Sequence, residues 1–112
     1  MHELSLATAL IESAAQHLPA GTRATLLEVE LGALEHVEES AFELAVEAVA
    51  EGTAFEGAVL RLVRIPLVIR CRVCANEYEP EDTFAFPCPA CEAVQPEVLS
   101  GHGLVLRAIE AE

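Results

Sequence analysis

Four cysteines dominate the chemistry that this sequence can perform. They form two pairs with two residues inside each pair and thirteen residues between the pairs: Cys71 and Cys74, then Cys88 and Cys91. A two-residue spacing lets the backbone turn so that both sulfurs reach one ion, and two such pairs complete a tetrahedral shell. Thiolates are soft, charged ligands that suit Zn(II) in a closed site. The spacing therefore predicts a structural zinc site.

The same cysteines admit other interpretations. A rubredoxin-like iron site has the same ligand set and would make the protein an electron carrier, but the surrounding segment is poor in the aromatic residues that usually pack around such sites. Free thiols are the weakest alternative, because close pairs in a reducing compartment are typical of metal sites. A further alternative is a protein-interaction adaptor that zinc merely stabilises.

A second candidate site lies at the start of the chain. The Met1 α-amine, the His2 backbone nitrogen and the His2 imidazole can bind one ion through fused five- and six-membered rings. A deprotonated amide nitrogen is a strong-field donor, which favours square-planar Ni²⁺ or Cu²⁺ over Zn²⁺. His2 alone is weak support for such a site, since a histidine near a chain end is usually an exposed polar residue.

The charge of the chain excludes several classes of partner. Nineteen acidic residues stand against six arginines, there is no lysine, and the formal net charge is −13. Nucleic acids and anionic membranes both require a basic patch, so neither is an expected partner. No Ser/His/Asp set, phosphate loop or paired-carboxylate pattern indicates an enzyme.

We expect a cytoplasmic location. The start Met1-His2-Glu3 carries an acid where a signal peptide has basic residues, and no long apolar run follows it. No stretch approaches the roughly 20 apolar residues that a bilayer span needs.

The pattern of apolar residues predicts an α+β fold. It favours helices over residues 4–18 and 38–51, and strands over residues 27–31, 58–65, 67–70 and 104–109. We expect two helices packed on a small sheet of about three strands, with an inserted zinc-binding module.

The inserted module is recognised by its composition. Residues 71–98 hold all the cysteines and four of the six prolines, and they are short of aliphatic residues. We therefore expect two domains: residues 1–70 plus 99–112 as an α/β domain, and residues 71–98 as a zinc-binding module inserted between two strands.

Several motifs together resemble one known family. In order along the chain they are Met1-His2-Glu3-Leu4-Ser5 before a helix, Gly32 after an alternating strand, Phe42-Glu43, Glu56-Gly57-Ala58, and the Cys71-x₂-Cys74 and Cys88-Pro89-x-Cys91 pairs. This arrangement resembles the HypA family of hydrogenase maturation factors, and the resemblance covers essentially the whole chain.

The resemblance implies a nickel metallochaperone without catalytic activity. Such a protein helps to insert Ni(II) into the large-subunit precursor of NiFe-hydrogenase, together with a HypB-like GTPase, and in some organisms it also serves urease maturation proteins. By motif, His2 would be the nickel ligand, Met1 and Glu3 would supply backbone nitrogens, and Glu38 would approach the nickel. The four cysteines would be the zinc ligands.

Overall fold

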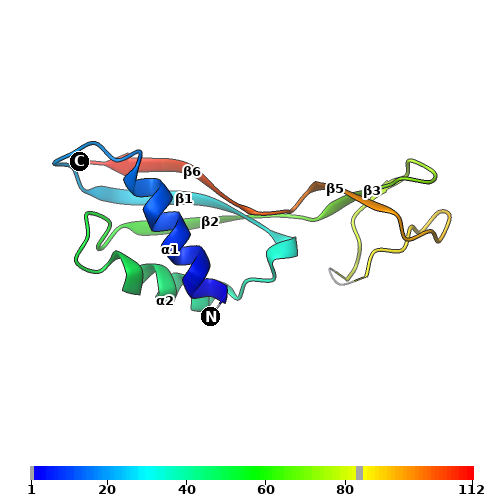
Figure 1. The fold of residues 1–112 in the computed structure, drawn as a ribbon, viewed down its shortest axis with the longest axis horizontal. Coiled ribbons are helices and arrows are strands. Elements are labelled where there is room, and N and C mark those ends of the chain that lie inside the picture. Colours follow the sequence, from blue (N-terminus) through cyan, green and yellow to red (C-terminus); the bar gives the residue numbers. More distant parts are fainter. Residues whose placement is uncertain (1, 83–84) are drawn as a thin grey trace. The chain divides into compact units, whose positions relative to one another are not determined.

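The computed structural model describes residues 2–82 and 85–112, and these form two compact units. Figure 1 shows the helices and strands of both units along the chain. The first unit consists of Met1–Glu30, Val37–Val63 and Leu104–Glu112. The second consists of Leu31–His36 and Arg64–Gly103.

The first unit is built from two helices and a three-stranded sheet, which confirms the predicted α+β fold. The helices are α1 (His2–Ala15) and α2 (Glu39–Ala50), and the strands are β1 (Ala24–Gly32), β2 (Val59–Ile65) and β6 (Leu104–Ala111), in the order β2-β1-β6. In Figure 1, β1 and β2 point the same way, as expected for two strands joined by a crossover helix. β6 runs antiparallel to β1. A reciprocal pair of 3.0 Å hydrogen bonds joins the backbones of Arg23 and Glu112, which is the pattern of an antiparallel pair.

The core of this unit follows from the spacing of its apolar residues. Residues three or four apart on a helix share one face, and alternate residues share one face of a strand. The buried side chains accordingly include Ala7, Leu10, Ile11 and Ala14 on α1, Phe42, Val46 and Ala50 on α2, and Leu27 and Val29 on β1. Helix α1 packs against both α2 and β6.

Helix α1 ends earlier than the sequence pattern predicts. The predicted helix reaches residue 18, whereas α1 stops at Ala15 and the chain continues with i→i−3 hydrogen bonds from Gln16 and His17. These tighter bonds close the helix ahead of Pro19, so His17 lies beyond the last helical turn. In the described residues, 2–82 and 85–112, no helix has the length and apolar content needed to cross a membrane.

The second unit contains a sheet that the sequence pattern does not predict. Its strands are β3 (Val68–Cys71), β4 (Glu77–Tyr78) and β5 (Pro96–Ser100), in the order β4-β3-β5, and both pairings are antiparallel. The predicted module spans residues 71–98, whereas the long segment of the second unit runs from Arg64 to Gly103, and Leu31–His36 also belongs to that unit. The difference arises because β3 and β5 pair with each other over their whole length.

Three backbone segments of the second unit meet at glycines. The Leu34 N–H donates to the Gly101 carbonyl at 2.8 Å, and the Gly103 N–H donates to Glu35 Oε2 at 2.9 Å. A Cβ on Gly32 would lie 2.3 Å from the Gly101 carbonyl oxygen, and a Cβ on Gly101 would lie 2.5 Å from the Cα of Leu67. No larger side chain fits at either glycine. We call the close contacts of Gly32 with Gly101, and of Gly101 with Leu67, the glycine junction.

Candidate metal centres

The four cysteine sulfurs converge on one point. All four Sγ atoms lie within 4.8 Å of one another, and the Cys71–Cys91 and Cys74–Cys88 pairs are each 3.6 Å apart. A tetrahedron with Zn–S bonds of about 2.3 Å has sulfurs about 3.8 Å apart. All four cysteines are free thiols and not disulfides. The donor set and its spacing therefore fit a tetrahedral zinc ion.

The two halves of the cluster are built in the same way. Each half is a tight loop in which the residue after the second cysteine donates its N–H to the carbonyl of the first cysteine. These bonds run from Ala75 to Cys71 and from Glu92 to Cys88, both at 2.8 Å. The first loop directly follows β3, and the second precedes β5, so the sheet holds both loops at one end.

Burial and hydrogen bonds hold two of the four sulfurs, those of Cys71 and Cys88, in place. Cys71 and Cys88 are each only 1% exposed, whereas Cys74 and Cys91 face solvent. The Asn76 side-chain amide lies 3.8 Å from the Cys88 sulfur and donates a hydrogen bond to it. This contact was not predicted from the sequence, although an amide two positions after a ligating cysteine is a recognisable signal.

The thiols of the cluster differ in acidity. Burial opposes ionisation of Cys88, but hydrogen bonds from the backbone N–H groups of Cys91 and Ala90 outweigh it and lower the Cys88 pKa to about 6. For Cys91, the Ala93 N–H favours the thiolate, but burial and hydrogen bonds from the other thiols raise its pKa to about 12. Thiols this close share protons unless a cation compensates their charge, so the cluster is suited to a divalent ion.

Both tight loops require an unusual backbone conformation. Ala75 and Glu92 each have a φ of 65°, in the left-handed region that favours glycine. We expect Ala75→Gly, and likewise Glu92→Gly, to stabilise the second unit by about 0.5–1 kcal/mol, since relief of this strain exceeds the added entropy of the unfolded chain. The chelator concentration that removes half of the metal measures the effect. Ala90→Gly, at a position without a positive φ, is the matched control and should lower stability; equal responses at Ala75 and Ala90 would contradict the prediction.

A hydrogen bond joins the starts of the two helices, and each start carries a carboxylate. Glu3, in the first turn of α1, accepts a hydrogen bond at Oε2 from the Glu38 N–H at 3.3 Å. Glu38 is the N-cap of α2, and its carboxylate accepts from the N–H groups of Ser40 at 3.3 Å and Ala41 at 2.6 Å. His2 is exposed at the beginning of α1. Met1, the remaining residue of the expected nickel site, lies outside the described residues.

Hydrogen bonding keeps both carboxylates of this pair ionised. The Ser40 hydroxyl, followed by the Ala41 N–H, holds the pKa of Glu38 below its usual range. The N–H groups of Glu3 itself and of Glu38 lower the pKa of Glu3 in the same way. The region beside His2 is therefore negatively charged at neutral pH, which favours a cation there.

Comparison with known proteins identifies the family. A family model described as "Hydrogenase/urease nickel incorporation, metallochaperone, hypA" matches residues 1–111. The chain belongs to the HypA family. The "Hydrogenase maturation factor HypA" of Geotalea uraniireducens is 35% identical over 112 residues, and the alignment covers 100% of each chain. That of Roseiflexus sp. is 34% identical, with 100% of this chain and 93% of the relative covered.

Solved structures share the fold of this HypA-family chain. The solution structure of the nickel metallochaperone HypA from Helicobacter pylori aligns with a TM-score of 0.68 and 23% identity, covering 98% of this chain and 97% of that one. A second solution structure of a HypA protein aligns with a TM-score of 0.62 and 22% identity, covering 96% and 90%. At these identities the likeness concerns the fold.

Proposed function

We propose that this chain carries Ni(II) at its N-terminus and helps to insert it into NiFe-hydrogenase during maturation of that enzyme. Membership of the HypA family, over essentially the whole chain, is the observation that carries this proposal. The exposed His2 and the carboxylates of Glu3 and Glu38 support it, because they give the start of α1 both a nitrogen donor and a negative surrounding.

In this proposal the nickel ligands come from the first residues of the chain. The Met1 amine, the His2 backbone nitrogen and the His2 imidazole form the chelate, and the Glu3 backbone nitrogen completes a planar set. The Glu38 carboxylate already accepts hydrogen bonds from Ser40 and Ala41. Direct coordination by Glu38 would compete with capping of α2, so its expected contribution is negative charge near the ion.

We expect His2→Ala to remove tight Ni²⁺ binding and to leave the fold intact. The imidazole is one of the chelating donors, whereas an exposed residue at a helix start contributes little to the core. Equilibrium dialysis with Ni²⁺ on untagged protein measures binding, and the melting temperature should change by no more than a degree or two. His17→Ala, which changes an exposed histidine beyond the end of α1, is the matched control. Undiminished nickel binding by His2→Ala would overturn the proposed site.

We further propose that Zn(II) occupies the four-cysteine cluster and holds the second unit together. Zinc supplies no open coordination position there, because Cys71, Cys74, Cys88 and Cys91 fill a tetrahedral shell. The rubredoxin-like alternative predicts visible absorption from iron bound to four thiolates, which zinc does not give. The absorption spectrum of the purified protein therefore separates the two.

We expect Cys88→Ser to lower zinc content below one ion per chain and to loosen the second unit. Metal binding at such a site is also folding free energy, and Cys88 is one of the two buried ligands. Zinc analysis and protease sensitivity of residues 64–103 measure this, while the helical circular dichroism of the first unit serves as the internal control. Stoichiometric zinc and unchanged protease resistance would contradict a ligand role for Cys88.

The proposal includes partners and a location. The client is the large-subunit precursor of NiFe-hydrogenase, a HypB-like GTPase cooperates in the transfer, and urease maturation proteins are further candidate recipients. A carrier of this kind performs no catalysis and works in the cytoplasm, where reduced thiols can bind zinc. The net charge of −13 supports metal delivery over binding to nucleic acid or to anionic membranes.

A further inference from the structure

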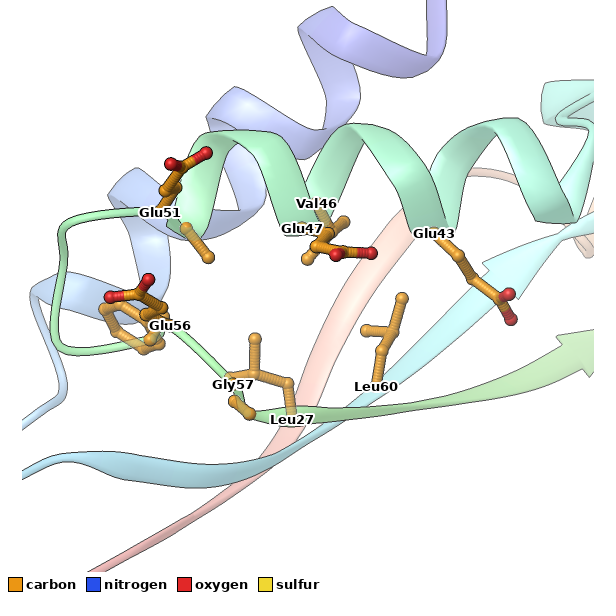
Figure 2. A pocket seen from close by; sticks show the side chains of 11 residues that line it. Leu27, Glu43, Val46, Glu47, Glu51, Glu56, Gly57 and Leu60 are labelled. Atoms are coloured by element: carbon orange, nitrogen blue, oxygen red, sulfur yellow. The ribbon is translucent and has the colours of Figure 1, made fainter.

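A groove lies between α2 and β2 in the first unit, and the residues assigned to metals are not among its lining residues. It has a volume of about 770 Å³. We call it the acidic groove and define it by six of its lining residues: Glu43, Glu47, Glu51, Glu56, Leu27 and Leu60. Figure 2 shows Glu43 and Glu47 extending from α2 beside the opening, with Leu60 pointing from β2 toward the helix.

The glutamate charges along this groove lower the stability of α2. Glu43 and Glu47 lie four residues apart on α2, and Glu51 follows four residues later, directly after the last residue of the helix, so like charges face each other on successive turns. Such pairs destabilise a helix. Glu51 is also the C-cap of α2, at the end where the helix dipole favours a cation. The fold therefore keeps a charge arrangement that its own stability does not require.

In the part of the chain that the structure describes, none of the three arginines of the first unit forms a salt bridge with a carboxylate of the groove. Arg61 pairs with Glu28 at 4.0 Å, and this pair lies on the sheet. Arg107 pairs with Glu30 at 3.2 Å on the same sheet. Arg23 donates to the backbone carbonyl of Glu56, a lining residue of the groove, at 3.2 Å and forms no salt bridge with the Glu56 carboxylate. Within residues 2–82 and 85–112, no salt bridge neutralises the carboxylates of the acidic groove.

The shape of the groove favours a polypeptide over a small cation. Among the described residues, the four cysteines are the group of side chains whose ligand atoms converge closely enough to hold a metal ion. The glutamates of the groove are instead spread along the helix. Apolar side chains accompany them: Leu60 lines the groove, and Leu44, next to Glu43 on α2, is 67% exposed.

We propose that the acidic groove docks a basic, amphipathic segment of a partner protein. Lysine or arginine side chains of that segment pair with the four glutamates, and its apolar side chains contact Leu60 and Leu44. Charge complementarity identifies the occupant. The groove offers a line of glutamates without salt bridges beside apolar side chains, and a segment that carries both basic and apolar side chains matches these two features. A second copy of this chain, at a net charge of −13, lacks the required basic surface.

A labelled peptide of about 15 residues tests the proposal, with lysines and leucines alternating so that in an extended conformation one face is basic and the other apolar. The protein is the full, zinc-loaded chain, and binding is measured by fluorescence anisotropy and by amide shifts in NMR spectra. We expect Glu43→Gln/Glu47→Gln to weaken binding about tenfold, because two charge pairs are lost. The matched control, Glu110→Gln/Glu112→Gln, removes the same charge from the C-terminal end of β6 and should change binding by less than about twofold.

The other possible results either support or overturn the docking of a basic segment in the acidic groove. Amide shifts concentrated on α2 and β2, and weaker binding of a peptide whose leucines are replaced by serine, support it. Equal weakening by both double variants, or shifts spread over other acidic surfaces, would show non-specific attraction and overturn it. Spermidine or Mn²⁺ producing the same shifts at equal or lower concentration would assign the groove to a small cation instead. Absence of peptide binding at low salt would also overturn it.

Discussion

We expect acylation of the Met1 α-amine to abolish tight Ni²⁺ binding while leaving the zinc content unchanged. The sequence has no lysine, so an amine-directed reagent has this amine as its target. An α-amine has a reference pKa of about 7.7–8.0, well below that of a lysine side chain, and reacts under mild conditions. Acylation converts it to an amide, which is a poor donor until it loses a proton. Since loss of a supporting residue around a metal already costs about 10–100-fold in affinity, loss of a ligand should cost about a hundredfold or more.

Mass spectrometry supplies the control for this experiment, because it must show a single adduct on the first residue and none on the cysteines. An N-terminal tag should reproduce the loss, since it moves the free amine away from His2. Circular dichroism should be unchanged in both cases. If the acylated protein binds nickel as tightly as untreated protein, the amine is not a ligand, and the site must be rebuilt from His2, backbone nitrogens and a carboxylate such as Glu38.

The second large effect is expected at the glycine junction. Gly101 has a φ of +91°, and a Cβ there would lie 2.5 Å from the Cα of Leu67 and 2.7 Å from the carbonyl oxygen of Pro66. Gly101→Ala therefore combines left-handed backbone strain of about 1–2 kcal/mol with an overlap between backbones that no rotamer can relieve. We expect the melting temperature to fall by about 10 °C or more, and zinc to be released at lower chelator concentration.

Two neighbouring glycines separate the causes of that loss. Gly103 also has a positive φ, +88°, but no atom lies within 4 Å of the position of its Cβ, so Gly103→Ala reports the backbone strain alone. Gly32 has a φ of −72°, so Gly32→Ala reports the overlap with Gly101 alone. We expect Gly101→Ala to exceed both. A Gly101→Ala variant no less stable than Gly103→Ala would refute the close packing of these segments.

The cysteine cluster was predictable because its geometry is local. Two cysteines separated by two residues are brought together by one tight loop, whatever the rest of the chain does. The positive φ of Ala75 and Glu92 follows from the same loop, at positions where glycine is the usual residue. The helices were predictable for a similar reason, since apolar spacing identifies the buried face of α2 through Phe42 and Val46.

Long-range pairing was not predictable in this way. The β3–β5 sheet joins residues more than twenty positions apart, as in the partnership of Ile69 with Val98, and Pro96 at the start of β5 disguises the strand. The glycine junction is also invisible in sequence, because Gly32 and Gly101 are neighbours only once the chain has folded. The role of Glu38 as a helix cap was unexpected too, since Ser, Thr, Asp and Asn are the usual residues there.

The order of strands along the chain has a consequence for how the protein folds. β6 belongs to the sheet of the first unit, yet roughly forty residues separate Ile65 at the end of β2 from Leu104 at the start of β6. Those residues include both cysteine pairs and the paired strands β3 and β5. If zinc folds this stretch, as proposed above, the open loop that must close before β6 can add to β1 becomes much shorter, and the entropic cost of closing it falls by about 2 kcal/mol. Under that proposal, zinc supply during synthesis would affect how fast the half of the chain that bears His2 completes its sheet.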